Sequence, residues 1–215
     1  MASRVPAASQ FAVYGPTFLD VVMGPLDGPP VPGREAWVEG ALMCAGGPAN
    51  QAIALARLGV PVRLHARVGV DQMGQFVDGM LAREGVDTSS CERVGDQNVT
   101  VSLSFDGDRA MTTRGTTALP RLGGDAPACL LADVRGISAN SEVVSSWRER
   151  GTWVLADTAW DEAGAWDPAD LEALRVADVC TPNEEEALAR TSELLDSLVG
   201  ASRDREIRVS RESDA

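Results

Sequence analysis

Lysine is absent from this sequence of 215 residues, in which arginine supplies all 19 of the Lys+Arg residues and His65 is the single histidine. Without lysine, the chain has no amine for a Schiff base and no lysine for the phosphate loop of Walker-type nucleotide-binding proteins. A lone histidine with no second candidate ligand is more typical of a structural residue than of a catalytic one, so His65 is assigned no role. These scarcities exclude several kinds of catalytic site.

Cysteines and long apolar runs are scarce as well. The cysteines are Cys44, Cys91, Cys129 and Cys180, and they form no Cys-x-x-Cys pair, which favours reduced thiols in a cytoplasmic protein. No apolar run is long enough to span a bilayer, and the first ten residues lack the apolar core of a signal peptide. The net charge of −13 and the pI of about 4.5 argue against nucleic acid or an anionic membrane as a partner.

The most informative segment is residues 46–52, with the sequence Gly-Gly-Pro-Ala-Asn-Gln-Ala. Two glycines allow a tight turn and a close approach to a ligand, and Pro48 suits the first turn of a helix. Apolar residues at 53–58 give that helix a body, and Gly59 ends it. The segment therefore predicts a strand-to-helix elbow with Asn50 in the first turn, although such an elbow can also be only a tight connection.

Short apolar runs alternate with helical patterns along the chain. Strands are predicted at 11–15, 62–68, 128–132, 152–157 and 177–181, and helices at 48–58, 71–84, 138–150, 168–175 and from 182 onward. This alternation is typical of an α/β fold with a parallel sheet that is covered on both faces. Ligands of such sheets bind beyond the carboxyl ends of the strands, where Asp157 and the turn at 181–183 lie.

A second pattern predicts a small antiparallel unit. Apolar and polar residues alternate from Val99 to Phe105, a turn follows at 106–108, and the chain returns to Thr113, which indicates a hairpin with one wet face. The segment from Glu35 to Cys44 alternates weakly and is a further candidate strand. An ordinary surface hairpin is the alternative to a functional lid.

Two groups of polar residues are candidate ligand contacts. Asp20 lies within the apolar run 18–22, where a carboxylate is costly to bury unless it is paired or bound to a ligand; a turn or cap aspartate is the alternative. Asn183 and Glu186 are three residues apart, so they share one face of a predicted helix. Acidic residues also favour the first turn of any helix, which is the plainer explanation of that pair.

The sequence resembles the ribokinase-like (PfkB) carbohydrate kinases from about Phe11 to about Ala187. The residues that stand at the spacings of that family's first signature are Gly46, Gly47, Asn50, Ala52, Gly59 and Gly69. The segments 67–74 and 81–87 are similar to the family as well. The resemblance implies a three-layer α/β/α fold with a mostly parallel sheet and a small β lid, in which a strand near 35–44 pairs with one near 98–113.

The resemblance also implies a function and its residues. Asp20, Gly46, Gly47 and Asn50 would bind the substrate, a small-molecule sugar or nucleoside, because a carboxylate accepts hydrogen bonds from hydroxyls. Asn183 and Glu186 would serve the cofactors ATP and Mg²⁺, with Glu186 organising the metal and its waters. The activity implied is phosphoryl transfer to a sugar hydroxyl, and a homodimer through the lid is an option.

One part of the family pattern is missing. The resemblance implies a Gly-Ala-Gly-Asp segment that supplies the catalytic base and an anion hole, and no such segment occurs in this sequence. We therefore expect a C-terminally truncated fold in which residues 1–190 form an incomplete ribokinase-like α/β domain and 191–215 a divergent, poorly ordered tail. Turnover would be absent or weak, and a non-catalytic sugar- or nucleoside-binding remnant is the alternative.

Overall fold

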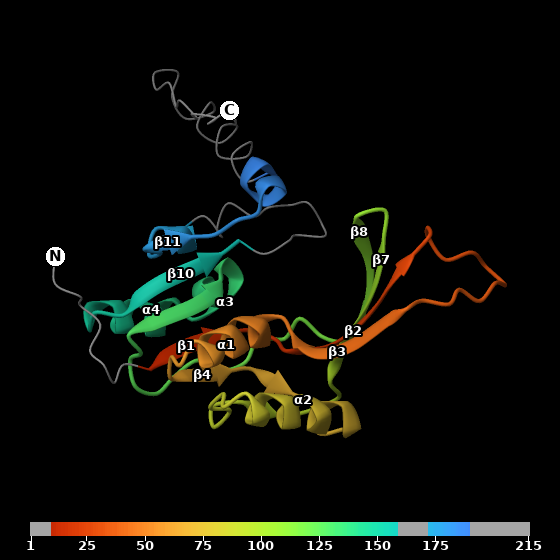
Figure 1. The fold of residues 1–215 in the computed structure, drawn as a ribbon. Helices are drawn as coiled ribbons and strands as arrows, with labels where there is room; N and C mark the ends of the chain where they lie inside the picture. Colours follow the sequence, from red (N-terminus) through yellow and green to blue (C-terminus); the bar gives the residue numbers. More distant parts are fainter. Residues whose placement is uncertain (1–9, 159–171, 190–215) are drawn as a thin grey trace, which may run out of the picture.

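The computed structural model describes residues 10–158 and 172–189 (Figure 1). The main sheet has parallel strands in the order β11-β10-β9-β1-β4. These strands are β1 Phe11–Tyr14, β4 Val62–His65, β9 Cys129–Asp133, β10 Trp153–Asp157 and β11 Val179–Cys180. The expected tail at 191–215 and the first half of the expected helix at 168–175 lie outside the described residues.

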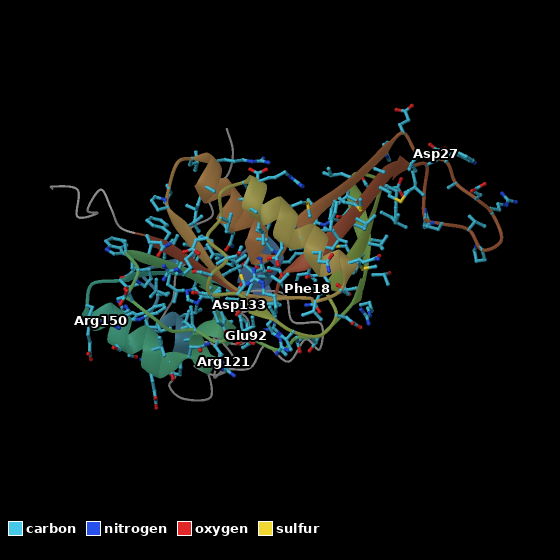
Figure 2. All side chains as sticks on the ribbon, turned by 90° about the horizontal axis from the view of Figure 1, so that it is seen from below. Phe18, Asp27, Glu92, Arg121, Asp133 and Arg150 are labelled. Atoms are coloured by element: carbon cyan, nitrogen blue, oxygen red, sulfur yellow. The ribbon has the colours of Figure 1, made fainter. Side chains whose placement is uncertain are left out.

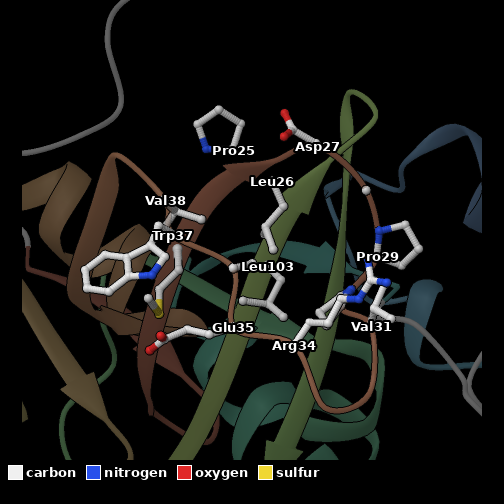
Figure 3. Close-up of a pocket in the computed structure, with 14 residues that line it drawn as sticks. Pro25, Leu26, Asp27, Pro29, Val31, Arg34, Glu35, Trp37, Val38 and Leu103 are labelled. Atoms are coloured by element: carbon white, nitrogen blue, oxygen red, sulfur yellow. The ribbon is translucent and has the colours of Figure 1, made fainter.

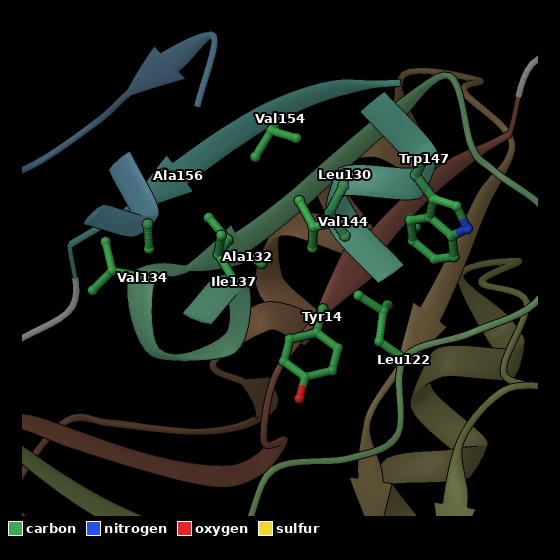
Figure 4. Close-up of a cluster of buried hydrophobic side chains, with 12 residues drawn as sticks. Tyr14, Leu122, Leu130, Ala132, Val134, Ile137, Val144, Trp147, Val154 and Ala156 are labelled. Carbon is green, nitrogen blue, oxygen red and sulfur yellow. The ribbon is translucent and has the colours of Figure 1, made fainter. Parts of the chain in front are cut away.

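Helices cover both faces of this sheet. The helices α1 (Pro48–Arg57) and α2 (Gln72–Arg83) pack on one face, and α3 (Val134–Ala139) and α4 (Ser141–Glu149) pack on the other. The buried side chains form a first core cluster between the sheet and α1 and α2, and a second between the sheet and α3 and α4. Because successive side chains of a strand point to opposite faces, Val13 belongs to the first cluster and Tyr14 to the second. Trp147 of α4 is the largest buried side chain of the second cluster (Figure 4). The expected three-layer α/β/α fold is confirmed.

Local signals explain where the first two helices begin and end. Gly47, with φ of 62°, precedes α1, Pro48 occupies the first turn, and Gly59, with φ of 75°, follows its end. At α2 the Asp71 side chain accepts a hydrogen bond from the backbone N–H of Gly74 over 2.8 Å. Both helices match their predicted ranges.

Two predicted elements are divided in the structure. The predicted helix at 138–150 is instead α3 and α4, because Asn140 interrupts it and donates from Nδ2 to Tyr14 Oη and to the Gly136 carbonyl. The predicted strand at 62–68 divides at Ala66, where the chain leaves the main sheet. Beyond that residue, β5 (Arg67–Val68) pairs in parallel with β6 (Glu92–Arg93) in a separate ladder.

A second sheet, the lid, extends away from the carboxyl edge of the main sheet (Figure 1). Its strands are β2 Phe18–Leu26, β3 Gly40–Gly46, β7 Asn98–Phe105 and β8 Asp108–Arg114, in the order β3-β2-β7-β8. The predicted hairpin is confirmed as β7–β8. The strand expected at 35–44 begins only at Gly40, and it pairs with β2 and not with 98–105, because β2 lies between them. The Gly/Pro-rich segment at 25–33 predicts a loop, whereas β2 continues to Leu26 before that loop begins.

The strand register places Asp20 in a row of polar residues on one face of the lid. Asp20 pairs with Cys44 on one side and with Thr100 on the other, and Thr100 pairs with Thr113, so these residues form one row across the sheet. The hydroxyls of the two threonines are hydrogen-bonded over 3.0 Å. The alternate row carries Val21, Met43 and Val101 on the opposite face. The candidate substrate residue Asp20 therefore lies in a polar row, whose neighbouring row on the same face carries Val22, Leu42 and Met111.

Asp87 joins the outer strand of the main sheet to the segment after α2. Its carboxylate accepts hydrogen bonds from Arg63 of β4 over 2.9 Å, from the Gln10 side chain over 3.1 Å and from the backbone N–H of Ser89 over 2.9 Å. Partial burial alone would raise the pKa of this carboxyl, but hydrogen bonds from Ser89 and Arg63 outweigh it and hold the pKa well below its usual range.

This depressed pKa predicts a loss of stability in acid. The stability from the Asp87 carboxylate is complete above the pKa of the unfolded chain, near 4, and is lost as the pH falls further toward the folded-state pKa. We expect Asp87→Asn to lower the free energy of unfolding by about 1–2 kcal/mol at pH 7 and by clearly less at pH 2, because most of the loss falls between pH 3 and the folded-state pKa. Urea denaturation at both pH values measures the difference, and an equal loss at both would contradict this account.

Candidate functional site

A cavity of about 240 Å³ lies at the carboxyl edge of the main sheet. The ends of β1, β9 and β10 and the start of α1 form it, through Tyr14, Gly15, Pro16, Gly47, Pro48, Gln51, Ala132, Asp133 and Asp157. This edge is where parallel α/β sheets bind ligands, and Asp157 lies there as the sequence predicts. The cavity and the base of the lid thus meet at the predicted elbow.

Close packing between Asp20 and Gly46 shapes this elbow. The Asp20 side chain lies directly over Gly46, where a Cβ would overlap both carboxylate oxygens. At Gly47, which has φ of 62°, a Cβ would lie 2.8 Å from the Pro16 carbonyl oxygen and 2.9 Å from the Phe18 ring. The observed conformation leaves no room for a Cβ at either position, at Gly46 because the Asp20 carboxylate occupies that space and at Gly47 because of the backbone conformation and its neighbours.

The Asp20 carboxylate has no hydrogen-bond or ion-pair partner among the described residues, although it is half-buried. Burial raises its pKa above the usual range. Burial, and then the charge of Asp20, also raises the pKa of the neighbouring Cys44 thiol, which keeps that thiol protonated at neutral pH. A half-buried carboxylate without partners is unfavourable unless a ligand donates hydrogen bonds to it.

Asn50 lies in the first turn of α1, four residues after Gly46. Its backbone N–H donates to the Gly47 carbonyl over 3.0 Å, and its exposed side-chain amide has no hydrogen-bond partner among the described residues. The predicted substrate residues Asp20, Gly46, Gly47 and Asn50 are thus gathered at one elbow, with a free carboxylate and a free amide. Together they can both accept hydrogen bonds from hydroxyls and donate to them.

Asn183 and Glu186 form a reciprocal cap at the start of the helical residues 184–189. The Asn183 side chain accepts from the Glu186 backbone N–H over 2.9 Å, and Glu186 Oε2 accepts from the Asn183 N–H over 3.0 Å. The sequence analysis placed the two on one helix face, but Asn183 instead precedes the helix. The spacing Asn-x-x-Glu is itself a capping signal and could have indicated this arrangement.

Glu186 also links its helix, which follows β11, to the end of β10. Its Oε2 accepts a hydrogen bond over 2.8 Å from the Thr158 hydroxyl, which directly follows β10, and the residue is only 7% exposed. The second oxygen, Oε1, has no partner among the described residues. Those residues also contain no group of three or more His, Cys, Asp or Glu side chains able to hold a metal ion. Glu186 could therefore bind a metal only together with waters or a ligand.

Asp133 is a site residue that the sequence analysis did not identify. It pairs in register with Asp157 across β9 and β10, and both line the cavity. Asp133 Oδ1 accepts from the Gly136 N–H over 2.6 Å, so the side chain also caps α3. An acid placed directly after the buried run 129–132 was the available signal. Figure 2 shows Asp133 near the centre of the molecule and Asp27 at the far end of the lid.

A larger cavity of about 700 Å³ lies at that far end, between β2 and β7 and the loop that follows Asp27 (Figure 3). Leu26, Trp37 and Leu103 are among its lining residues, and the Trp37 side chain is 88% exposed. It contains none of the predicted site residues. No described helix is long and apolar enough to cross a membrane.

Comparison with known proteins gives consistent relatives. Residues 39–118 match the family model described as pfkB family carbohydrate kinase. A fructokinase of Vibrio alginolyticus is 28% identical over 172 residues, which are 70% of this chain and 56% of that protein. The chain thus spans a little over half the length of this curated relative.

Solved structures show the same fold. A PfkB protein from Polaromonas sp. JS666 superposes with a TM-score of 0.69 and 21% identity over 86% of this chain and 69% of its own. The fructokinase of Xylella fastidiosa, solved with bound ATP, has a TM-score of 0.67 and 22% identity over 89% of this chain and 67% of its own.

The contact between Asp20 and Gly46 can be tested without a ligand. We expect Gly46→Ala to fold but to push the Asp20 carboxylate toward solvent, because the short acidic side chain can rotate whereas the backbone cannot. The pKa of Asp20, followed by carboxyl ¹³C NMR, should then fall toward its ordinary value. Gly123→Ala is the matched control, since a Cβ there meets no atom within 4 Å. An unchanged Asp20 pKa in Gly46→Ala would refute the close contact.

Proposed function

We propose that this chain, part of which matches the model of the pfkB family carbohydrate kinases, forms the acceptor side of an ATP-dependent sugar kinase. The substrate would be a small sugar or a nucleoside, bound between the elbow at 46–50 and the row of the lid that contains Asp20. The observation that carries this proposal is the half-buried Asp20 carboxylate, which lies over Gly46 and has no partner among the residues that the structure describes.

Binding of a polyol would satisfy groups that the free protein leaves unsatisfied. Two adjacent hydroxyls can donate to the two oxygens of Asp20, and the Asn50 amide can donate to or accept from a third. The lid row of Thr100 and Thr113 lies on the same face as Asp20 and adds hydroxyls that adapt to either direction. Closure of this face over the substrate would exclude water from the reacting hydroxyl.

Glu186 is the residue that we propose for the Mg²⁺ side. The ion prefers oxygen ligands and keeps several waters, and the unpartnered Oε1 of a buried carboxylate is suited to accept hydrogen bonds from those waters. When bound, ATP would supply the phosphoryl group and Mg²⁺ would offset the negative charge of the phosphates. Asn183 holds Glu186 in place through the reciprocal cap.

The 215 residues contain no Gly-Ala-Gly-Asp segment, and this observation favours the second candidate function. Phosphoryl transfer to a hydroxyl requires a proton acceptor and hydrogen-bond donors to the developing negative charge. The family resemblance implies that the Gly-Ala-Gly-Asp segment would supply both. We therefore propose that the 215-residue chain, tested by itself, binds sugar but has little or no turnover. A non-catalytic sugar- or nucleoside-binding protein is the corresponding alternative.

Calorimetry with D-ribose, D-fructose and adenosine, each with and without Mg-ATP, tests the acceptor site. We expect one of them to bind the wild-type chain, and Asp20→Asn to weaken that binding by about 10- to 100-fold, because a charge-assisted hydrogen bond is lost. The same variant should raise the melting temperature by up to about 4 °C, since it removes a half-buried unpaired charge.

Asp125→Asn, which changes an exposed acid outside the cavity, is the control for this experiment and should alter neither quantity. Failure of the whole panel to bind would refute the acceptor site. Phosphorylation of any sugar at the rates usual for kinases, about 1–100 per second, would refute the expected lack of turnover.

Glu186→Gln tests the phosphate side. Glutamine retains an oxygen that can accept from Asn183 and Thr158, so the cap should persist, but it removes the charge that would orient metal-bound waters. We expect the affinity for Mg-ATP to fall about tenfold while the melting temperature changes little. Glu185→Gln, at an exposed neighbouring position, is the control. Equal Mg-ATP affinities in the two variants would contradict a role for Glu186.

A further inference from the structure

Gln97 is an uncharged side chain buried to 1% exposure at the point where the chain enters the lid. Its Oε1 accepts from the Gly69 backbone N–H over 3.0 Å, and its Nε2 donates to the carbonyls of Thr17 over 3.0 Å and of Asn98 over 3.2 Å. Both donors of the amide and its carbonyl are therefore used. One side chain thus ties together the segments that lead into β2 and β7 and the loop that precedes α2.

The loop at 67–71 is the fixed side of this junction. The Arg67 carbonyl accepts from the Thr17 hydroxyl over 2.6 Å, and Asp71 Oδ2 accepts from the Gln97 backbone N–H over 3.2 Å. Gly69 is tightly enclosed, because a Cβ there would overlap the backbone of Gln97. Asp71 also caps α2, so the junction is anchored in the core of the molecule.

The lid ladder that contains Asp20 starts directly above this junction. Phe18 and Asn98 form the first pair between β2 and β7, and Asp20 and Thr100 form the third. The Gln97 side chain donates to the Thr17 carbonyl, and these two residues immediately precede the first pair. The position of Asp20 relative to Gly46 therefore depends on how the start of β2 is held.

We infer that Gln97 is a positioning residue for Asp20, because its buried amide fixes the start of β2 against the loop at 67–71. None of its side-chain hydrogen bonds goes to a residue that lines the cavity at the carboxyl edge, so its effect on a ligand is indirect, through the residues that it positions. The relevance to sugar binding rests on the function proposed above, whereas the structural part of the inference does not.

The structural part can be tested by hydrogen exchange on the full chain. Gln97→Met keeps the length of the side chain and removes all three hydrogen bonds. We expect exchange at residues 18–23 and 98–103 to become at least tenfold faster, with little change in β9 and β10. Thr152→Val is the matched control, because it removes a buried hydrogen bond to the Pro127 carbonyl at the opposite edge of the sheet. It should leave exchange in the lid unchanged.

Two results would overturn the inference: an unchanged lid in Gln97→Met, or a uniform increase in exchange across the lid and the main sheet, which is the mark of a merely structural residue. If Gln97→Met does not fold, Thr17→Val replaces it. This variant keeps the shape of the side chain, removes the neighbouring bond to Arg67, and should give the same local pattern.

The functional part is tested by a double-mutant cycle with the sugar that the calorimetric panel identifies. If Gln97 acts through Asp20, Gln97→Met should weaken binding about tenfold in the wild type and hardly at all in Asp20→Asn. Additive losses in the two backgrounds would overturn the inference. Local opening of the lid together with no sugar binding by the wild type would uphold the junction and refute the proposed function, so the two failures are distinguishable.

Discussion

The structure depends on one close approach, in which the Asp20 carboxylate lies over a backbone position that has no Cβ. This contact brings the base of the lid onto the elbow before α1, whose next residue, Gly47, lines the cavity at the carboxyl edge of the sheet. The arrangement is costly in the free protein, as the raised pKa of Asp20 indicates. Stability given up in this way is typical of residues that are retained for binding.

Much of the main domain could be predicted from local signals. Two glycines and a proline specified the elbow, Asp71 specified the start of α2, and short apolar runs specified the strands of the main sheet. These signals act within a few residues of the element that they define, so one sequence is enough to interpret them. The candidate substrate residues followed from the resemblance, and the structure gathers them at one elbow.

The features that could not be predicted depend on contacts between distant residues. Asn140 divides a helical pattern because its side-chain amide reaches Tyr14 on β1. Nothing in the sequence around Gln97 indicates that this residue joins three segments. Strand β2 continues past Gly24 and Pro25 because distant strands pair with it before and after them: Gly24 pairs with Gly40, and Leu26 pairs with Phe105 after a shift in register. Glu186 is different, because the Asn-x-x-Glu spacing of a helix cap was visible in the sequence. The sequence left open only which of two local explanations applied, ligand contacts on one helix face or the preference of acidic residues for the first turn of a helix.

The parallel pairing of β2 with β7 has a consequence for the order of folding. A parallel ladder cannot be closed by a tight turn. Strand β7, which adds Thr100 to the polar row of the lid, is synthesised long after Asp20 and Cys44. Chain-distant pairings of this kind form slowly, because the loop between them must be ordered first. During synthesis on the ribosome, the edge of β2 that pairs with β7 must therefore stay open until β7 emerges, and an open strand edge can mispair with other nascent chains.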